Sequence, residues 1–527
     1  MSRLSGVPVH KRLARSLLCC GLLGLNACTM LGPDYKEPEV AWLSSWQPDL
    51  YGEVAAPQQQ AEDDLRFWWQ VFNDSALNRL IAAARQDNLS LRIAGLRILE
   101  SRAQLGIAGS NLYPQLQQLN GAIDRVHTRQ RGGALPNDDQ TLTSYQAGFN
   151  LAWELDFWGR FRRGIESADA AFFGSIANQQ DVQVLLSAQV TDLYFSYRTT
   201  QLRIVIARQN AAIQKRSYEI AERIYKSGQD SELDLQQART QYLATLATIP
   251  QLEITLTNLR NALCALLGRP PGDLPELAGP VDRLPGMDVS RFGEIPARLL
   301  LRRPDVRAAV WQVAAQSAQI GIAEADVYPA ISLFGGIGWG GNTLSGTPDT
   351  TTLSIGPHLT WNIFDHGRVS NNVRVQDARL QQLIESYQDR VLQAAREIDD
   401  AAIGIVKTRE QDAVLAESVQ ASERALALAN TLYQEGYADF QRVLDSQRAV
   451  FSQAERRLIN QGNHVAAVIG LYKALGGGWQ PTPVEQVIAQ PVRETMQERS
   501  DWGDLLTAPL PADADAPPST SRTSPHD

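Results

Sequence analysis

The sequence has few cysteines and histidines, which limits the chemistry open to it. It contains four cysteines and six histidines among 527 residues. Cys19 and Cys20 lie in the N-terminal leader, and Cys264 is alone on an apolar stretch, so no disulfide is expected within one mature chain. No histidine has metal-ligand spacing to another histidine or to a cysteine. We therefore expect no disulfide framework, no metal site and no cofactor.

Catalytic signatures are also lacking. We find neither a Gly-x-Ser-x-Gly elbow nor a P-loop. Residues 336–341 satisfy Gly-x-Gly-x-x-Gly, but a loop follows, whereas a dinucleotide fingerprint must open a helix. We interpret these glycines as a hairpin at a barrel rim, and His366 as a strand-to-helix cap. The sequence thus indicates a protein that is not an enzyme.

Long apolar runs and basic clusters are missing as well. After the leader, no run of 18 or more apolar residues occurs, which excludes a membrane-spanning helix. It leaves open a β-barrel, because the strands of a barrel alternate and escape hydropathy averages. The formal net charge is −9, and removal of the basic leader makes the mature chain more acidic. An acidic chain without a basic cluster argues against a nucleic-acid partner.

The N-terminus reads as a secretion signal over residues 1–27. A basic start and a short apolar stretch end in Leu25-Asn-Ala-Cys28, which resembles a bacterial lipobox. Cleavage there leaves Cys28 as a lipidated first residue, with acyl chains such as palmitate that anchor the protein without spanning the bilayer. Ordinary cleavage with a free thiol is the alternative. Thr29, and not an aspartate, follows the cysteine, which favours the outer membrane.

The rest of the chain is an internal duplication with a period of about 208 residues. Matching pairs recur along both halves: Tyr113-Pro114 with Tyr328-Pro329, Trp153 with Trp361, Gly159-Arg160 with Gly367-Arg368, and Gly228 with Gly436. Each half therefore reads as a helix, a strand pair, a very long helix, a tight turn and a returning helix. We divide the chain into a lipidated N-terminal and equatorial segment (28–74), a first repeat (75–290), a second repeat (291–479) and a disordered tail (480–527).

The predicted helices are long and coiled-coil-like. Apolar positions spaced three and four apart run from Leu235 to Leu266, and a matching series 209 positions later runs from Leu444 to Leu475. Pro250 interrupts the first series, so we expect a kink or a helix-to-helix junction near it. Residues 160–226 and 368–435 contain no proline, and a helix of that length spans roughly 100 Å. Such a length suits a tube that crosses a periplasm.

The predicted strands alternate with period two, which fits lipid on one face and water on the other. The lipid-facing candidates are Phe149, Leu151, Trp153, Leu155, Leu353, Ile355, Leu359 and Trp361. A third strand covers residues 331–339 and a weaker fourth covers 119–126, while Pro357 should mark a bulge. A soluble two-layer sheet is the alternative for these strands.

Four strands cannot close a barrel, and an open sheet edge is not viable in hydrocarbon. Other copies of the chain must therefore complete the wall. Two copies would give eight strands, whose interior is filled by side chains, whereas three would give twelve and leave a channel. A conduit therefore favours a homotrimer.

Five segments resemble the TolC outer-membrane factor family, in its lipoprotein branch with OprM and NodT-type efflux proteins. They are Cys28-Thr-Met-Leu-Gly-Pro-Asp-Tyr-Lys-Glu-Pro38, Phe67-Trp-Trp-Gln-Val-Phe72, Arg302-Arg-Pro-Asp305, Phe364-Asp-His-Gly-Arg368 and Gly436 through Arg448. The resemblance implies an α+β membrane protein: a TolC-like trimer with a 12-stranded β-barrel, four strands per chain, continuous with a long α-helical periplasmic barrel. It also implies coupling to a periplasmic adaptor and an inner-membrane pump.

The resemblance further implies a gate at the periplasmic tips, around Gly228 to Asp234 and Gly436 to Asp445. Three copies of Asp445 would form a carboxylate ring that attracts cations, and Val443 and Leu444 would narrow the bore. Arg442 departs from members that carry a second acidic ring there, and it can pair with Asp439 or Asp445. Asp234 and Asp445 can also be read as first-turn acids favoured by the helix dipole.

The function implied is that of a passive exit duct in a tripartite efflux system, for drugs or other small molecules. An outer-membrane component of a type I protein-secretion system is one alternative, and a non-channel, lipid-anchored helical scaffold is another. A periplasmic hydrolase is disfavoured by the absent catalytic motifs. The sequence names neither the cargo nor the pump.

Overall fold

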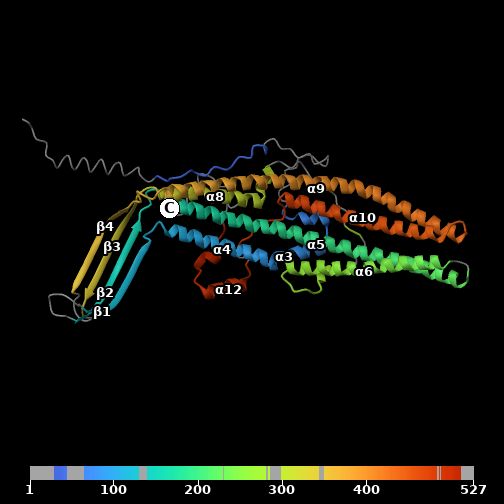
Figure 1. Cartoon of the computed structure of the whole chain (residues 1–527), viewed down its shortest axis with the longest axis horizontal. Coiled ribbons are helices and arrows are strands. Elements are labelled where there is room, and N and C mark those ends of the chain that lie inside the picture. Colours follow the sequence, from blue (N-terminus) through green and yellow to red (C-terminus); the bar gives the residue numbers. More distant parts are fainter. Residues whose placement is uncertain are drawn as a thin grey trace, which may run out of the picture.

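The computed structural model describes residues 29–43, 65–129, 139–228, 231–279, 283–284, 298–342, 349–483, 486 and 488–511. The leader and the lipidation candidate Cys28 lie outside these residues, as does the boundary between the two repeats at residue 290. Figure 1 shows an elongated protomer with a four-stranded sheet at one end and two long helical hairpins that reach the other end.

The helices and strands follow the predicted duplicated order. The first repeat holds α4 (Leu89–Ser110), β1 (Leu116–Arg129), β2 (Asp139–Glu154), α5 (Arg160–Lys226) and α6 (Glu232–Leu266). The second holds α8 (Pro304–Ala325), β3 (Ala330–Gly341), β4 (Thr350–Thr360), α9 (Arg368–Gln434) and α10 (Phe440–Ala474). Short elements flank them: η1 (Trp68–Phe72), α3 (Ser75–Asp87), η2 (Pro275–Leu277), α7 (Arg298–Arg302), α12 (Gln490–Arg499) and η4 (Gly503–Leu506).

The two repeats have equal helical hairpins. Helices α5 and α9 each contain 67 residues, and α6 and α10 each contain 35. At 1.5 Å per residue, 67 residues span roughly 100 Å, as expected. The starts of α6 and α10, Glu232 and Phe440, lie 208 residues apart. The 209-residue offset of the apolar series is therefore one residue longer than the structural repeat.

Helix α6 runs unbroken through Pro250, so the expected helix-to-helix junction is wrong. Packing along both hairpins supports the helix on either side of the proline. Leu252, next to it, lies in a buried cluster with Ile204 and Ala207 of α5. Tertiary packing of this kind offsets the roughly 3 kcal/mol that an interior proline costs.

The sheet has the order β1-β2-β3-β4, with antiparallel pairing throughout. The register aligns an apolar row across all four strands on one face: Leu119, Phe149, Ile337 and Leu353. The next row, on the opposite face, is small or polar: Asn120, Gly148, Gly338 and Thr352. The predicted period-two alternation is therefore present in three dimensions.

Two details of the strands differ from expectation. Pro357 pairs with Leu333 in a continuous ladder, so the expected bulge is wrong. Strand β4 is at the edge of the sheet, where a missing proline N–H is tolerated. Gly336 to Gly341 lie within strand β3 and do not form a hairpin, and a Cβ on Gly336 would approach Asn150 Oδ1 to 3.1 Å.

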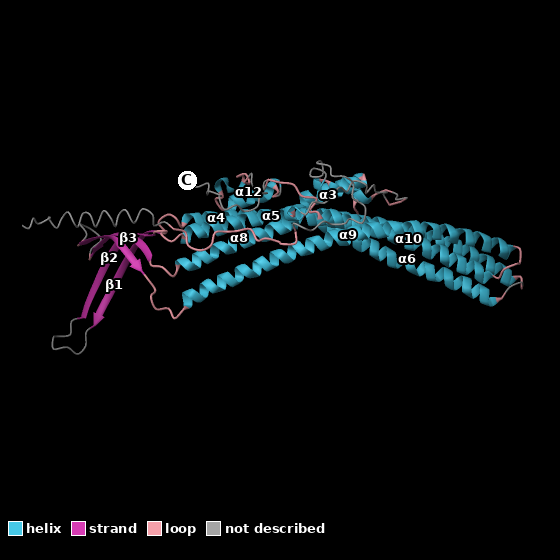
Figure 2. Cartoon of the chain, turned by 90° about the horizontal axis from the view of Figure 1, so that it is seen from above, coloured by secondary structure: helices cyan, strands magenta, loops and turns pink. Residues whose placement is uncertain are grey.

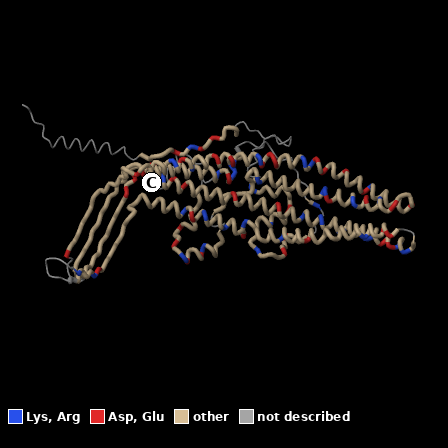
Figure 3. The backbone as a smooth tube through the Cα atoms, viewed as in Figure 1, with Lys and Arg blue, Asp and Glu red and all other residues tan. Residues whose placement is uncertain are grey.

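Charged residues are nearly absent from the middle of the sheet. Strands β3 and β4, of 12 and 11 residues, carry none, and Figure 3 shows the charges spread over the helices and at the two ends of the sheet. Eleven residues span about 36 Å along a strand, or about 28 Å once a typical barrel tilt is applied. This height matches the hydrocarbon thickness of a bilayer. Among the helices in the described part of the chain, none is long and apolar enough to cross a membrane.

The main hydrophobic core lies around the middle of the long axis, where the short elements pack on the helices. Trp68 of η1 stacks on Tyr472 of α10 with ring centroids 5.0 Å apart, and Phe72 contacts Phe195 of α5 at 4.6 Å. Trp68, Trp69 and Phe72 of this motif are therefore core residues, whereas Phe67 is exposed. Figure 2 shows α3 and α12 together on one side of the layer of long helices.

The predicted disordered tail is wrong for the part that the structure describes. Helix α12 and the turn η4 follow Gln480, and Ile488, Met496 and Leu506 are buried in the main core. Arg102 of α4 donates hydrogen bonds to the carbonyl oxygens of Leu505, Ala508 and Pro509, at 3.3, 2.7 and 2.7 Å. A few apolar anchors in a polar sequence are enough to order this segment, which composition alone does not reveal. Residues 512–527 lie outside the described part.

Candidate channel wall and periplasmic tip

Six of the eight predicted lipid-facing residues share one face of the sheet, on β2 and β4, whereas Leu155 and Trp361 follow the last residues of those strands. Leu353, Ile355 and Leu359 of β4 are exposed, with Ile355 at 87%. Phe149 on β2 is exposed, and Leu151, Trp153 and Leu155 are half-buried. Such a large exposed apolar surface on a folded sheet indicates contact with lipid or with another apolar surface.

Tryptophans mark the junction between strands and helices. The indole N–H of Trp153 donates to Leu112 O, and that of Trp361 donates to Val327 O, each at 3.1 Å. The two residues occupy equivalent positions in the two repeats. Trp158 donates to Pro329 O at 2.9 Å. Aromatic rings with one hydrogen-bonded polar end are typical of the membrane–water interface.

Both long helices begin at a glycine in the left-handed region, after an aspartate cap. Asp156 accepts hydrogen bonds from the N–H groups of Phe161 and Arg162. Asp365 accepts from Gly367 and Val369, at 2.9 and 2.7 Å, and these backbone donors lower the pKa of its carboxyl. The N-cap residue of α9 is Gly367, and Asp365 supplies the side-chain acceptor for the first turn, so the interpretation of His366 as the cap is wrong. His366 has a positive φ of 54°.

The two tips turn at the predicted glycines. Gly228 and Gly436 have φ values of +74° and +78°, a conformation that favours glycine. Helix α6 then begins behind Ser231, whose Oγ accepts from Asp234 N, and α10 begins behind Asp439, whose Oδ1 accepts from Arg442 N. Asp234 and Arg442 therefore occupy equivalent positions, and the two tips differ in charge there.

A small apolar cluster, which we call the tip cluster, joins the two hairpins near these turns. It comprises Ala221, Ala238, Ala429, Phe440, Val443 and Leu444. Val443 and Leu444 are only 2% and 1% exposed within one chain. Their predicted role in lining the bore is therefore wrong, because their side chains are enclosed by their own protomer. Sequence reasoning placed them at the constriction but could not tell which helix face is internal.

Two glutamines add hydrogen bonds between the hairpins. Gln241 Nε2 of α6 donates to Leu444 O at 3.1 Å, and Gln447 Nε2 of α10 donates to Ser217 Oγ of α5 at 2.7 Å. Gln241 and Gln447 are 5% and 2% exposed. Separating the hairpins would break both bonds and expose the tip cluster, so these contacts stabilise the conformation seen here.

The charged gate candidates are exposed near the same turns. Asp445 Oδ1 accepts from Gln441 at 3.0 Å and from Arg448 at 3.1 Å. Arg442 lies 3.8 Å from Asp439, which resolves the two predicted pairings in favour of Asp439. Exposed pairs of this kind contribute little to stability, and the Asp445 carboxylate stays at the surface beside Arg448.

Sequence reasoning missed the anchor of the N-terminal segment. Arg163 of α5 is 2% exposed and donates to Leu31 O, Gly32 O and the carboxylates of Asp34 and Glu166. Gly32 packs so closely on α8 that a Cβ at this position would collide with the backbone of Gly321. The contacting residues are far apart in sequence, so no local pattern could reveal them.

The Arg302-to-Asp305 motif is a second buried junction. Arg303 contacts both carboxylate oxygens of Asp305, and it also bonds Glu397 of α9 and Ala474 O at the end of α10. Asp181 of α5 lies in the same charged group, and burial together with Asp305 raises its pKa to about 6, against the opposing effect of Arg303, Arg390 and Lys473. The motif therefore ties the start of α8 to α9 and to the end of α10.

These features define a class of protein. Strand pairs with one apolar face, continuous with roughly 100 Å helical hairpins, are the protomer architecture of a TolC-like outer-membrane channel. The protein-family model described as outer membrane efflux protein matches residues 80–269 and 295–477. The chain belongs to the outer membrane efflux protein family. It is an outer-membrane channel component of an efflux system, and its family consists of channel proteins and not of enzymes.

Individual relatives cover most of the chain. The cation efflux system protein CusC of Escherichia coli O6:H1 is 30% identical over 465 residues, which cover 88% of this chain and 98% of CusC. The outer membrane protein OprJ of Pseudomonas aeruginosa is 31% identical over 472 residues, 87% of this chain and 94% of OprJ. The solved structure of the outer-membrane channel OprN is similar with a TM-score of 0.74 and 31% identity, covering 86% of this chain and all of OprN. The predicted fold and family are thus confirmed.

Proposed function

We propose that three copies of this chain close one wall and form the complete outer-membrane duct. One observation carries the proposal: the sheet of a single chain has two edges, β1 and β4, and an exposed apolar face. Unpaired edges are not viable in hydrocarbon, so β4 of one copy pairs with β1 of the next. Three copies supply twelve strands, enough to leave a water-filled passage.

In this proposal the Cys28 lipid and the barrel hold the protein in the outer membrane, and the helical hairpins extend into the periplasm. A periplasmic adaptor and an inner-membrane pump deliver cargo at the tips. Small molecules then diffuse outward, and the pump supplies the energy. No residue of this chain performs covalent chemistry.

The tips form the gate. Around a threefold axis, the exposed Asp445 carboxylates of three copies create a negative ring that attracts cations. The tip cluster and the two glutamine bonds hold each pair of hairpins together in the closed conformation. Opening separates the hairpins, and this step is coupled to adaptor binding.

The test is reconstitution of the purified, lipidated protein in a planar bilayer. We expect steady conductance from a trimeric species, with a preference for cations that weakens in Asp445→Asn. Asp501→Asn changes an exposed acid between α12 and η4, away from the tips, and serves as the control. A protein that inserts without conducting would contradict the proposed duct. Unchanged cation selectivity in Asp445→Asn would contradict the proposed carboxylate ring.

A further inference from the structure

A polar hollow of about 710 Å³ lies on the helical layer, and the gate and the membrane wall do not use it. Helices α4, α5, α8 and α9 all contribute to its lining. Part of the lining consists of small residues, among them Ala170, Ala171 and Gly174 of α5, which leave space between the helices.

The hollow faces away from α3, from α12 and from the segment that follows α10. Gln183 and Ser187 of α5 bond the backbone of residues 478–480, and Tyr194 of α5 bonds Asp74 beside α3. Ser167, Gly174 and Asn178, which line the hollow, lie on the opposite side of α5 by helical spacing. Figure 2 shows α3 and α12 on one side of the layer only. When three copies close a tube with these extra elements outside, the hollow opens onto the bore.

Two separate sets of hydrogen bonds orient polar groups of the hollow, one between α8 and α9 and the other between α8 and α5. Gln316 Nε2 donates to the side-chain and main-chain oxygens of Gln376, at 2.9 and 3.2 Å. Gln319 Nε2 donates to Ser167 Oγ at 2.8 Å, and Ser167 in turn donates to Ala315 O. Side chains held in this way present fixed dipoles to a ligand.

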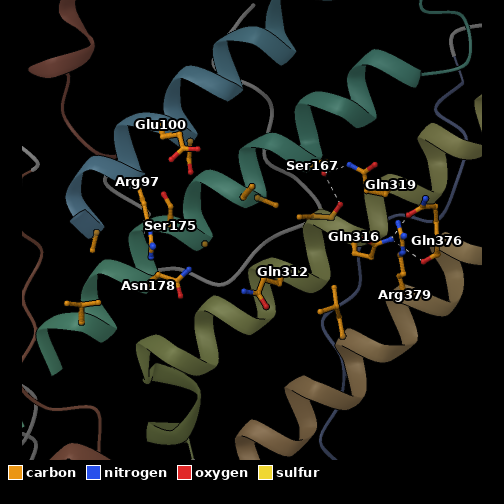
Figure 4. Close-up of a pocket in the computed structure, with 18 residues that line it drawn as sticks. Arg97, Glu100, Ser167, Ser175, Asn178, Gln312, Gln316, Gln319, Gln376 and Arg379 are labelled. Carbon is orange, nitrogen blue, oxygen red and sulfur yellow. Dashed lines mark hydrogen bonds between the residues drawn. The ribbon is translucent and has the colours of Figure 1, made fainter. Parts of the chain in front are cut away.

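Two arginines from opposite walls supply the charge. Arg97 extends from α4 toward Ser175 and Asn178, whereas Arg379 of α9 lies beside Gln316 and Gln376 (Figure 4). Both arginines are exposed, and within the described residues neither forms an ion pair. Glu100 is the only acid among the lining residues, so each hollow has an excess of one positive charge.

We propose that this hollow is a transient binding site for small organic anions, in which Arg97 and Arg379 hold carboxylate or phosphate groups and the amides accept or donate hydrogen bonds. Guanidinium groups bind such oxyanions in a fork geometry that neutral side chains cannot match. The inference rests on the proposed function only for the direction in which the hollow faces. All of its lining comes from one chain, so binding itself does not require a conducting channel.

The experiment uses the full-length protein in detergent and two matched probes. Saturation-transfer NMR compares citrate, which carries carboxylates, with its neutral trimethyl ester. We expect citrate to bind weakly, and its affinity to fall as salt rises, because the site is open to solvent. Each of Arg97→Gln and Arg379→Gln should weaken citrate about fivefold, the range of an exposed ion pair, and the double variant more. Lysine at either position should retain part of the affinity.

Arg396→Gln is the matched control, because Arg396 lies on the same helix α9 but outside the hollow and is similarly exposed. It should bind citrate like the unaltered protein. Equal citrate binding by the control and the double variant overturns the inference, as does binding of the ester as strong as that of citrate. A separate bilayer recording shows whether the protein conducts, so failure of the duct is distinguished from failure of the hollow.

Discussion

Leu444→Ala should loosen the closed periplasmic tip without unfolding the protein. Leu444 is buried in the tip cluster, where helices of both hairpins meet. Its backbone carbonyl, which accepts from Gln241, is kept in the variant, so only side-chain packing is lost. The change therefore tests the apolar contact between the hairpins on its own.

The magnitude follows from the size of the cluster. Removing a buried leucine side chain costs about 2–5 kcal/mol. The tip cluster is small and close to solvent, so its neighbours can collapse into the gap, and we take the lower end of the range. If opening exposes Leu444, about 2 kcal/mol shifts the closed-to-open equilibrium roughly 30-fold toward open, at 1.4 kcal/mol per factor of ten. The main core around Trp68 is unaffected, so the global melting temperature should change little.

Two assays measure this effect. Bilayer recordings give the open fraction, and hydrogen exchange over residues 440–447 reports separation of the hairpins independently of conductance. The control is Leu428→Ala, in α9 near the same tip, because Leu428 is 48% exposed. That variant should differ from the unaltered protein by less than about 0.5 kcal/mol.

Unchanged exchange in Leu444→Ala would refute the account of the tip. It would mean that the cluster does not hold the hairpins together. Faster exchange with an unchanged open fraction would support the role of the tip cluster in holding the hairpins together, but it would show that their separation does not open the channel.

Three further changes test other parts of the structure. Arg163→Ala removes the anchor of residues 31–34, so limited proteolysis should cut the N-terminal segment sooner, and unchanged cleavage would contradict that role. The pKa of Asp181 is raised to about 6, so the folded protein disfavours the charged carboxylate. The stability that the protonated carboxyl allows is fully present below pH 4 and is lost as the pH rises through 6. Asp181→Asn should therefore raise the melting temperature more at pH 7.5 than at pH 4.5, and a pH-independent difference would oppose the assignment. Gly436→Val places a β-branched residue at a φ of +78°, which should cost about 1–2 kcal/mol at the tip and speed local exchange, whereas Gly106→Val in α4 lacks that strain.

The repetitive parts of the molecule could be predicted from the sequence. The bounds of α5 and α9 were predicted to within one residue, because a Gly-Arg pair precedes each proline-free stretch and a turn glycine follows it. The period-two alternation predicted the strands and their apolar face. This worked because the register of the sheet places the apolar residues of neighbouring strands opposite one another on the same face. The tip turns followed from Gly228 and Gly436, where only a positive φ allows so sharp a reversal.

Features that depend on contacts between distant segments could not be predicted. The order of the segment after Gln480 rests on three apolar anchors and on Arg102, more than 350 residues earlier in the chain. Pro250 does not end α6, because the helix packs on α5 on either side of it. Pro357 does not interrupt β4, because a missing N–H is tolerated on an edge strand. Val443 and Leu444 were correctly placed at the tip, but which side of α10 is buried is decided by the neighbouring hairpin.

Oligomeric mass is the most direct test of the whole account. Native mass spectrometry of the lipidated protein, released from detergent, should give three times the mass of the mature chain, with the strands protected from exchange. A stable monomer whose apolar strand face is shielded without other copies would contradict the shared wall on which the duct depends.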